Sequence, residues 1–134
     1  MATVLVLPDT SWTGRAAVIE RVTHAVDVRG GNATEVCADL MRLAPQPPLI
    51  IVAHGSGCGL LPAVALAQRT AHRRVGAYVL VDPDAPAGSD TWPDAPVYVV
   101  STDQQITRMS TLRGWSVVDD DVIGAITRVV EDCT

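Results

Sequence analysis

The residues that could do chemistry gather in one stretch, 50–62, where an apolar run ends in a glycine-rich turn. The run 50–53 (IIVA) leads into 54–59 (HGSGCG), and a helix-like segment follows. In α/β proteins such a turn presents one side chain, or a row of backbone N–H groups, at the top of a parallel sheet. The available chemistry is proton transfer by His54, attack by Ser56 or Cys58, or binding of an oxygen anion by the N–H groups of Ser56 and Gly57.

Composition excludes several kinds of chemistry and partner. The chain of 134 residues has a net charge of −5, which argues against binding a nucleic-acid backbone. All ten basic residues are arginine, so the glycine-rich turn is not a P-loop and no Schiff-base lysine is available. Three scattered cysteines indicate free thiols in a reducing compartment. With no signal peptide or membrane-spanning run in the sequence, we expect a cytoplasmic protein without membrane partners.

Apolar runs alternate with helix-period segments along the whole chain, which predicts one domain over residues 1–134. The predicted strands cover residues 3–7, 25–28, 49–53, 77–81, 96–101 and 115–118. The predicted helices cover residues 13–24, 34–43, 59–72, 103–112 and 121–130. This alternation predicts an α/β three-layer sandwich: a six-stranded, mostly parallel sheet with helices on both faces. The loop 84–95 is the one with room to act as a lid.

In such a sheet the ligand crevice lies outside the carboxyl ends of the strands, at the switch in strand order. The residues that follow the predicted strands are therefore the candidates for a site. They are Asp9, Thr10, Ser11 and Trp12, the turn 54–59, Asp82 to Asp84, Thr102 and Asp103, and the acidic run 119–121.

Four segments resemble, in their order, the core of a small α/β hydrolase. They are VLVLPDTSW, LIIVAHGSGCGLLPAVALA, RRVGAYVLVDPDAP and PVYVVSTDQQI. The resemblance implies a minimal core without a cap, relative strand order 2-1-3-4-5-6, and an oxyanion loop after the first strand. It places the family's nucleophile at Gly55 and its acid at Asp103, and it expects a histidine after the last strand.

The chain departs from the hydrolase pattern at two of the three catalytic positions. Gly55 has no nucleophilic side chain, and Ser56 lies one residue late, where helix capping is its simpler role. No histidine follows the last strand; His24 and His72 end helices, which leaves only His54 in the turn. We interpret this as a degenerate triad. Asp9 is also unfavourable for hydrolysis, because a carboxylate repels the oxyanion that a hydrolase must stabilise.

The candidate site residues follow from these positions. We expect His54, Ser56 and Asp103 to carry any catalysis, with His54 and Asp103 moving protons. Asp103 could instead cap the helix after it. We expect a ligand to contact six further residues besides Gly57: Asp9, Thr10, Ser11, Trp12, Gly55 and Asp82. Asp82 is an alternative acid or a turn residue. Cys58 could be a thiol nucleophile if the helix N-terminus lowers its pKa, but the simpler expectation is a small buried cysteine in the first turn of a helix.

Two metal-binding readings compete with this one. The motif VAHGS is similar to the metal-facing histidine motif of small tetrapyrrole chelatases, in which His54 would bind the metal opposite a second histidine. The run 119–121 could hold Ca²⁺ or Mg²⁺, although acidic residues at a helix N-terminus explain it better. We expect neither a metal nor another cofactor.

The sequence therefore predicts a non-hydrolytic α/β-hydrolase-like protein. It would use the inherited crevice for a small acyl or polyketide-like ligand, as a pseudo-enzyme, cyclase or lyase of the kind found in natural-product biosynthesis. One alternative is a small serine esterase or thioesterase in which Ser56 is a displaced nucleophile. Another is a scaffold or interaction domain, since a capless core exposes apolar surface, and a homodimer would cover it.

Overall fold

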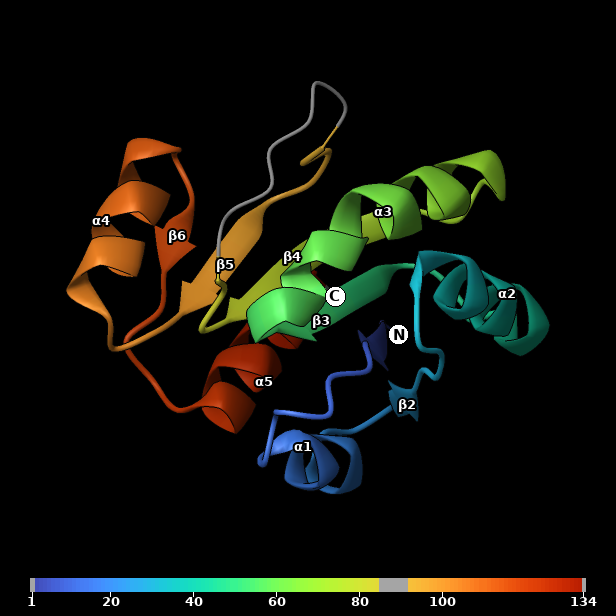
Figure 1. Ribbon diagram of the computed structural model, residues 1–134, viewed down its shortest axis with the longest axis horizontal. Helices are drawn as coiled ribbons and strands as arrows, with labels where there is room; N and C mark the ends of the chain where they lie inside the picture. Colours follow the sequence, from blue (N-terminus) through green and yellow to red (C-terminus); the bar gives the residue numbers. More distant parts are fainter. Residues whose placement is uncertain (1, 85–91, 134) are drawn as a thin grey trace.

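The computed structural model describes residues 2–84 and 92–133 and contains six parallel strands in the order β2-β1-β3-β4-β5-β6 (Figure 1). The strands are β1 (Thr3–Val6), β2 (Ala25–Asp27), β3 (Leu49–His54), β4 (Val75–Val81), β5 (Val97–Val100) and β6 (Ser116–Val117). The helices are α1 (Arg15–Arg21), α2 (Ala33–Leu43), α3 (Leu61–Thr70), α4 (Gln104–Leu112) and α5 (Val122–Cys133), with a 3₁₀ helix, η1 (Gly55–Leu60), before α3. The predicted fold class and strand order are confirmed, and every strand pair is parallel.

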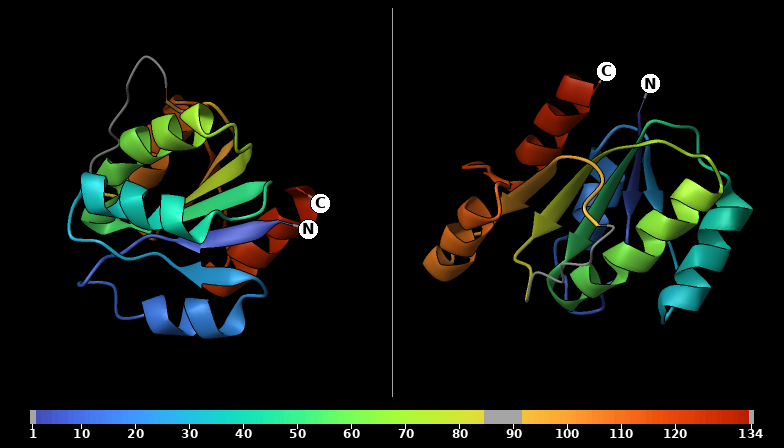
Figure 2. Two further views of the ribbon diagram at one scale, coloured as in Figure 1. Left: turned by 90° about the vertical axis from the view of Figure 1, so that its right-hand side faces the viewer. Right: turned by 90° about the horizontal axis from the view of Figure 1, so that it is seen from above.

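Helices cover both faces of the sheet, so the sheet is buried on two sides (Figure 2). Alternate residues of β3 show the division: Leu49 and Ile51 pack with α2 and α3, whereas Ile50 and Val52 pack with α1 and α5. This two-sided burial explains why the central strands read as unbroken apolar runs. No helix in the described ranges is long and apolar enough to cross a membrane.

The topological switch lies between β1 and β3. From β1 the chain passes through α1 to β2 on one side, and from β2 it returns through α2 to β3 on the other side. The loops that follow β1 and β3 therefore leave the sheet in different directions and open a crevice between them. Most of the predicted lid, residues 85–91 of the loop 84–95, lies outside the described residues.

Most helix boundaries differ from the predicted ones by one to three residues, and two of the differences have clear local reasons. Helix α1 ends at Arg21 because Val22 is extended and His24 has a left-handed φ of 62°. Residues 55–60 form a 3₁₀ helix before α3, in a segment whose three glycines disfavour an α-helix. Pro62 lies in the first turn of α3, where no hydrogen bond is lost.

The side chain of Arg15 holds the ends of β1 and β2 together. Its guanidinium donates to the carbonyl oxygens of Val6 (2.9 Å), Leu7 (3.0 Å) and Val28 (2.9 Å), and it pairs with Asp27 Oδ1 at 2.8 Å. These carbonyls lie where the two strands end, next to the crevice. Arg15 is therefore a structural cation that fixes the start of the loop after β1.

Replacing Arg15 with alanine should leave these acceptors and the Asp27 carboxylate without their donor. We expect Arg15→Ala to lower the free energy of unfolding by about 2–3 kcal/mol, since hydrogen bonds to charged groups are stronger than neutral ones. Urea unfolding followed by circular dichroism measures the loss. Arg108→Ala, an exposed arginine on α4, is the matched control; an equal effect of both changes would contradict the assigned role.

Candidate functional site

Asp9, His54 and Trp12 form a compact cluster at the carboxyl ends of β1 and β3. His54 Nδ1 and Asp9 Oδ2 are 2.7 Å apart, and the His54 ring stacks on Trp12 with 5.1 Å between ring centroids and 4° between planes. The side chains of Asp9 and His54 are 6% and 18% exposed, so the hydrogen bond is largely shielded from water while the imidazole keeps some access. The cluster joins the two strands on either side of the topological switch.

Local sequence explains how each member of the cluster reaches its place. Asp9 follows the strand terminator Pro8, and its Oδ1 accepts hydrogen bonds from Ser11 N (2.9 Å) and Ser11 Oγ (2.7 Å). This Asx turn leaves Oδ2 for the imidazole. His54 is the last residue of β3, and the two-residue period of the strand points its ring to the α1–α5 side with Val52.

The electrostatics of the cluster favour an ionised Asp9. Burial raises the pKa of Asp9, but the hydrogen bonds from His54 and Ser11, together with the coulombic effect of His54, outweigh burial and hold this pKa below its ordinary value. A carboxylate at Asp9 fixes the proton of a neutral imidazole on Nδ1, which leaves Nε2 as the basic nitrogen.

Gly55 occupies the position that the hydrolase resemblance assigns to the nucleophile. Its φ is +53°, which confirms a sharp turn that disfavours side chains. A Cβ built at position 55 would lie 3.2 Å from Asp9 Oδ2, and one at Gly57 would lie 3.3 Å from the Pro8 carbonyl oxygen. The loop after β1 therefore packs closely against the turn, and Asp9 lies where a side chain at position 55 would point.

A hollow of about 270 Å³ lies beside Asp9, and we call it the Asp9 hollow. It is lined by Pro8, Asp9, Thr10, Gly30, Gly31, Ser56, Gly57 and Leu60. The structure thus brings together four predicted site residues here: Asp9, Thr10, Ser56 and Gly57. Ser11 faces Asp9 as its hydrogen-bond donor, and Trp12 packs on His54 with 8% of its surface exposed.

The structure corrects the expectation for Ser56 and bears out the one for Cys58. The expected capping role of Ser56 is wrong, since neither η1 nor α3 has a side-chain cap, and Ser56 is exposed. Cys58 is buried, as expected of a small cysteine at the start of a helix, and is not an activated thiol. Burial, with the charges of Asp84 and Asp9, raises the pKa of Cys58 to about 12, so the thiol stays protonated.

Asp82 and Asp103 lie around a different hollow. This second space, about 350 Å³, is lined by Asp82, Pro83, Asp84, Asp103, Gln105, Ile106 and Met109. Asp103 Oδ1 accepts hydrogen bonds from Gln105 N and Ile106 N, which makes it the N-cap of α4. The carboxylate that binds the His54 ring is therefore that of Asp9, from the loop after β1. The acid position implied by the hydrolase resemblance falls instead on Asp103.

Neither metal-binding reading is supported. Within residues 2–84 and 92–133, no three His, Cys, Asp or Glu side chains come together as a metal site requires. Asp121 Oδ1 accepts from Gly124 N at 2.6 Å, and Asp120 pairs with Arg128, as expected for acids at the start of a helix. The predicted helix-terminus role of this run is confirmed.

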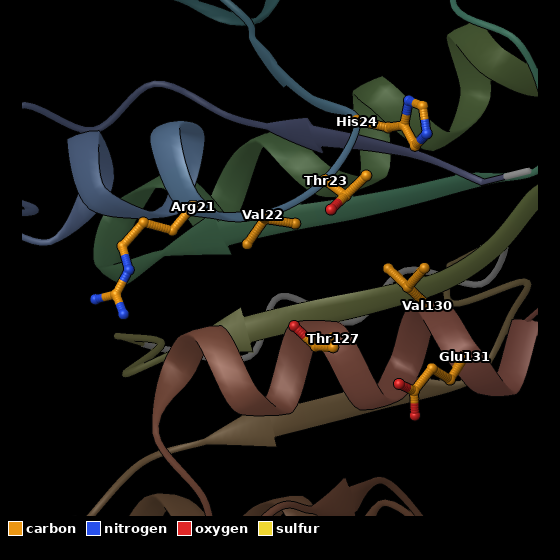
Figure 3. A pocket seen from close by; sticks show the side chains of 7 residues that line it. All are labelled: Arg21, Val22, Thr23, His24, Thr127, Val130 and Glu131. Atoms are coloured by element: carbon orange, nitrogen blue, oxygen red, sulfur yellow. The ribbon is translucent and has the colours of Figure 1, made fainter.

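A larger hollow of about 430 Å³ lies between the C-terminal end of α1 and helix α5, and Figure 3 shows its lining. The residues that line it are Arg21, Val22, Thr23, His24, Thr127, Val130 and Glu131. His24 immediately precedes β2, so this hollow lies at the opposite end of the strands from the crevice. It holds none of the predicted site residues.

Sequence reasoning missed the pairing within the cluster, although it named each member. Asp9 and His54 are 45 positions apart, and no periodicity links them. The contribution of Gly30, Gly31 and Leu60 to the Asp9 hollow was also missed. The available signal was topological: residues that follow adjacent parallel strands meet at one edge of the sheet.

Comparison with known proteins adds no relative. No protein family matches this sequence, and no curated protein is similar enough to it to identify one. The α/β fold with its all-parallel sheet therefore rests on the structure itself.

The depressed pKa of Asp9 predicts an acid-sensitive contribution to stability. Because this pKa is lower in the folded chain, the contribution is complete above about pH 4 and is lost as the pH falls further. Between pH 6 and pH 3 we expect the unfolding free energy of wild type to fall more than that of Asp9→Asn, which cannot titrate there. Urea unfolding at each pH measures the difference, and Asp119→Asn is the exposed control. Parallel curves for wild type and Asp9→Asn would contradict the assignment.

Proposed function

We propose that this protein is a non-hydrolytic α/β-hydrolase-like protein that binds a small acyl or polyketide-like molecule above β1 and β3. In this proposal the reaction is a cyclisation or an elimination, and His54 moves a proton to or from the ligand during it. The observation that carries the proposal is the 2.7 Å contact between His54 Nδ1 and Asp9 Oδ2, with Trp12 stacked on the imidazole.

The cluster has the features that a general base needs. A carboxylate on one ring nitrogen sets the tautomer and stabilises the imidazolium that forms when the other nitrogen takes a proton. The stacked indole limits rotation of the ring, so its basic edge keeps one direction. The His54 side chain is 18% exposed but does not line the Asp9 hollow, so a ligand seated there has to extend past the Asp9 carboxylate to reach the imidazole.

The same geometry argues against hydrolysis through an acyl-enzyme. The position at which a hydrolase carries its nucleophile is Gly55, and the space beside it is filled by Asp9. A carboxylate there opposes an oxyanion, since like charges at this distance repel. Proton abstraction by His54 needs no nucleophile at position 55, but it also places negative charge on the carbonyl oxygen as an enolate forms. That oxygen therefore has to lie on the polar groups of the hollow and not against the Asp9 carboxylate.

The Asp9 hollow indicates the kind of ligand. It has a volume of about 270 Å³ and no Lys or Arg in its lining, and Asp9 makes its charge negative. A small neutral carbonyl compound fits these properties better than a phosphate or a carboxylate does. Thr10 and Ser56, together with the backbone of Gly57, supply the polar groups that would orient a carbonyl oxygen.

One observation favours a second candidate, the serine esterase or thioesterase. Ser56 is exposed and lines the same hollow as Asp9, so its hydroxyl can meet a ligand bound there. In that case Ser56 would be the nucleophile, one residue after the usual position.

Covalent labelling separates the two candidates. We expect no adduct by intact-mass analysis after incubation with a broad fluorophosphonate, and no turnover of p-nitrophenyl esters from acetate to octanoate, because no nucleophile stands at position 55. The folded state is checked by circular dichroism. An adduct that disappears in Ser56→Ala would establish the esterase and overturn the proposed reaction class.

Proton transfer can be measured directly with methyl 3-oxooctanoate as a polyketide-like probe. We expect the protein to accelerate exchange of its C2 protons in D₂O, and His54→Gln to lose about a hundredfold of that acceleration, the usual range for general acid–base catalysis. Glutamine keeps a polar group for Asp9, so the fold should survive. Equal exchange by wild type, His54→Gln and buffer alone would contradict a catalytic His54.

A further inference from the structure

The α2–α3 face of the molecule carries exposed apolar side chains on either side of a groove. Figures 1 and 2 show the two helices side by side on this face. Met41 on α2 is 76% exposed and Leu66 on α3 is 55% exposed. Between them is a groove of about 540 Å³ whose lining includes Ala63 and Ala67. We call it the α2–α3 groove.

The shape of this groove suits another helix. Alanine side chains keep the surface between α2 and α3 low, while Met41 and Leu66 rise at its sides. An amphipathic helix can place its apolar side chains in such a groove, spaced three and four residues apart. A methionine at the edge also adapts easily to a partner's surface.

Charge restricts what kind of helix this surface accepts. Next to the groove is a second hollow of about 480 Å³, the basic hollow, which is lined by Arg69, His72, Arg73, Arg74, Val75 and Asp94. Arg73 lines both spaces, so the apolar groove and the basic hollow are neighbours that meet at this side chain. In a chain of net charge −5, this concentration of cations is local.

Arg73, the cation that lines the groove, is held in place without being neutralised. Arg73 donates to Gln68 Oε1 (3.3 Å), and Gln68 is 1% exposed and anchored by its own bond to the Val64 carbonyl oxygen. In the described part of the chain neither Arg73 nor Arg74 has a carboxylate within 4 Å. Asp94, the one acid in the hollow, already binds Tyr78 Oη and pairs with Arg69.

Basic residues just after the C-terminal end of α3 also interact favourably with the helix dipole, and this effect alone would explain why the charges here are positive. That effect does not explain why a buried glutamine orients Arg73 at the mouth of an apolar groove. Because its positive charge is left unbalanced, the surface is complementary to acidic groups.

We propose that the α2–α3 groove binds an amphipathic helix of a partner protein, and that acidic residues of that helix form ion pairs with Arg73 and Arg74. A second copy of this chain is less suitable, because the lining of its own α2–α3 groove brings the same Arg73 and no acidic residue. This docking surface shares no lining residue with the Asp9 hollow and is independent of the proposed function.

The test uses a synthetic helical peptide with leucines on one face and glutamates on the other. Added to the ¹⁵N-labelled protein, it should cause saturable shifts of amide signals in α2 and α3, and binding should weaken as salt is raised. Leu66→Asp, and separately Arg73→Gln and Arg74→Gln, should each weaken binding tenfold or more. Arg108→Gln on α4 and a peptide with lysines in place of glutamates are the controls.

Three outcomes would overturn the proposal. The first is the absence of saturable shifts with the acidic peptide, and the second is equal binding of the lysine peptide. The third is unchanged binding in both Leu66→Asp and Arg74→Gln; both residues are exposed, so these variants should still fold. Light scattering of the protein alone supplies a further check. A dimer that Leu66→Asp separates would show that a second copy occupies the groove instead. Exchange of the β-keto ester protons should be unchanged in these variants, which separates this proposal from the one about His54.

Discussion

The hydrogen bond between Asp9 and His54 is the constraint on which the rest of the site depends. It joins the loop after β1 to the end of β3. These two strands lie on either side of the point where the strand order reverses, and the crevice opens there. Ser11 holds the other oxygen of Asp9, Trp12 covers the imidazole, and Arg15 fixes the strand ends behind them. Three residues that closely follow Asp9 in the chain thus support its contact with His54, which lies 45 positions away.

This contact also explains the departure from the hydrolase pattern. With the loop after β1 packed against the turn, the residue after His54 has a left-handed φ, and its Cβ would lie 3.2 Å from Asp9 Oδ2, so a side chain there would require Asp9 to shift. Gly55 avoids both problems. Gly57 is similarly limited by the Pro8 carbonyl oxygen. A serine at position 55 and a carboxylate at position 9 would compete for the same volume. Under the proposed function, the glycine at position 55 and the Asp9–His54 pair belong together, and the histidine is held for a purpose other than activating a serine.

Sequence patterns predicted the fold almost completely, since buried parallel strands are unbroken apolar runs and the helices between them keep their period. They could not locate the end of α1, which depends on a left-handed His24, or the 3₁₀ turn before α3. In the site, position relative to the strands was enough to select Asp9, Trp12 and His54 individually. The pairing was not predictable, because it depends on which strands are neighbours and on the face to which each side chain points. Asp103 shows the converse: it occupies the expected place along the chain, yet its carboxylate caps α4.

The position of the proton on the His54 ring tests this account most directly. Every role given to the cluster requires the proton to be on Nδ1 and to be donated to Asp9. Long-range ¹H–¹⁵N correlation spectra of the histidine rings, recorded at pH 8.5 where imidazole is ordinarily neutral, distinguish the two tautomers, and His54→Gln assigns the signal. We predict a proton on Nδ1 and a bare Nε2 for His54, with a change in this signal in Asp9→Asn. A proton on Nε2, or a ring signal unaffected by Asp9→Asn, would contradict the central claim.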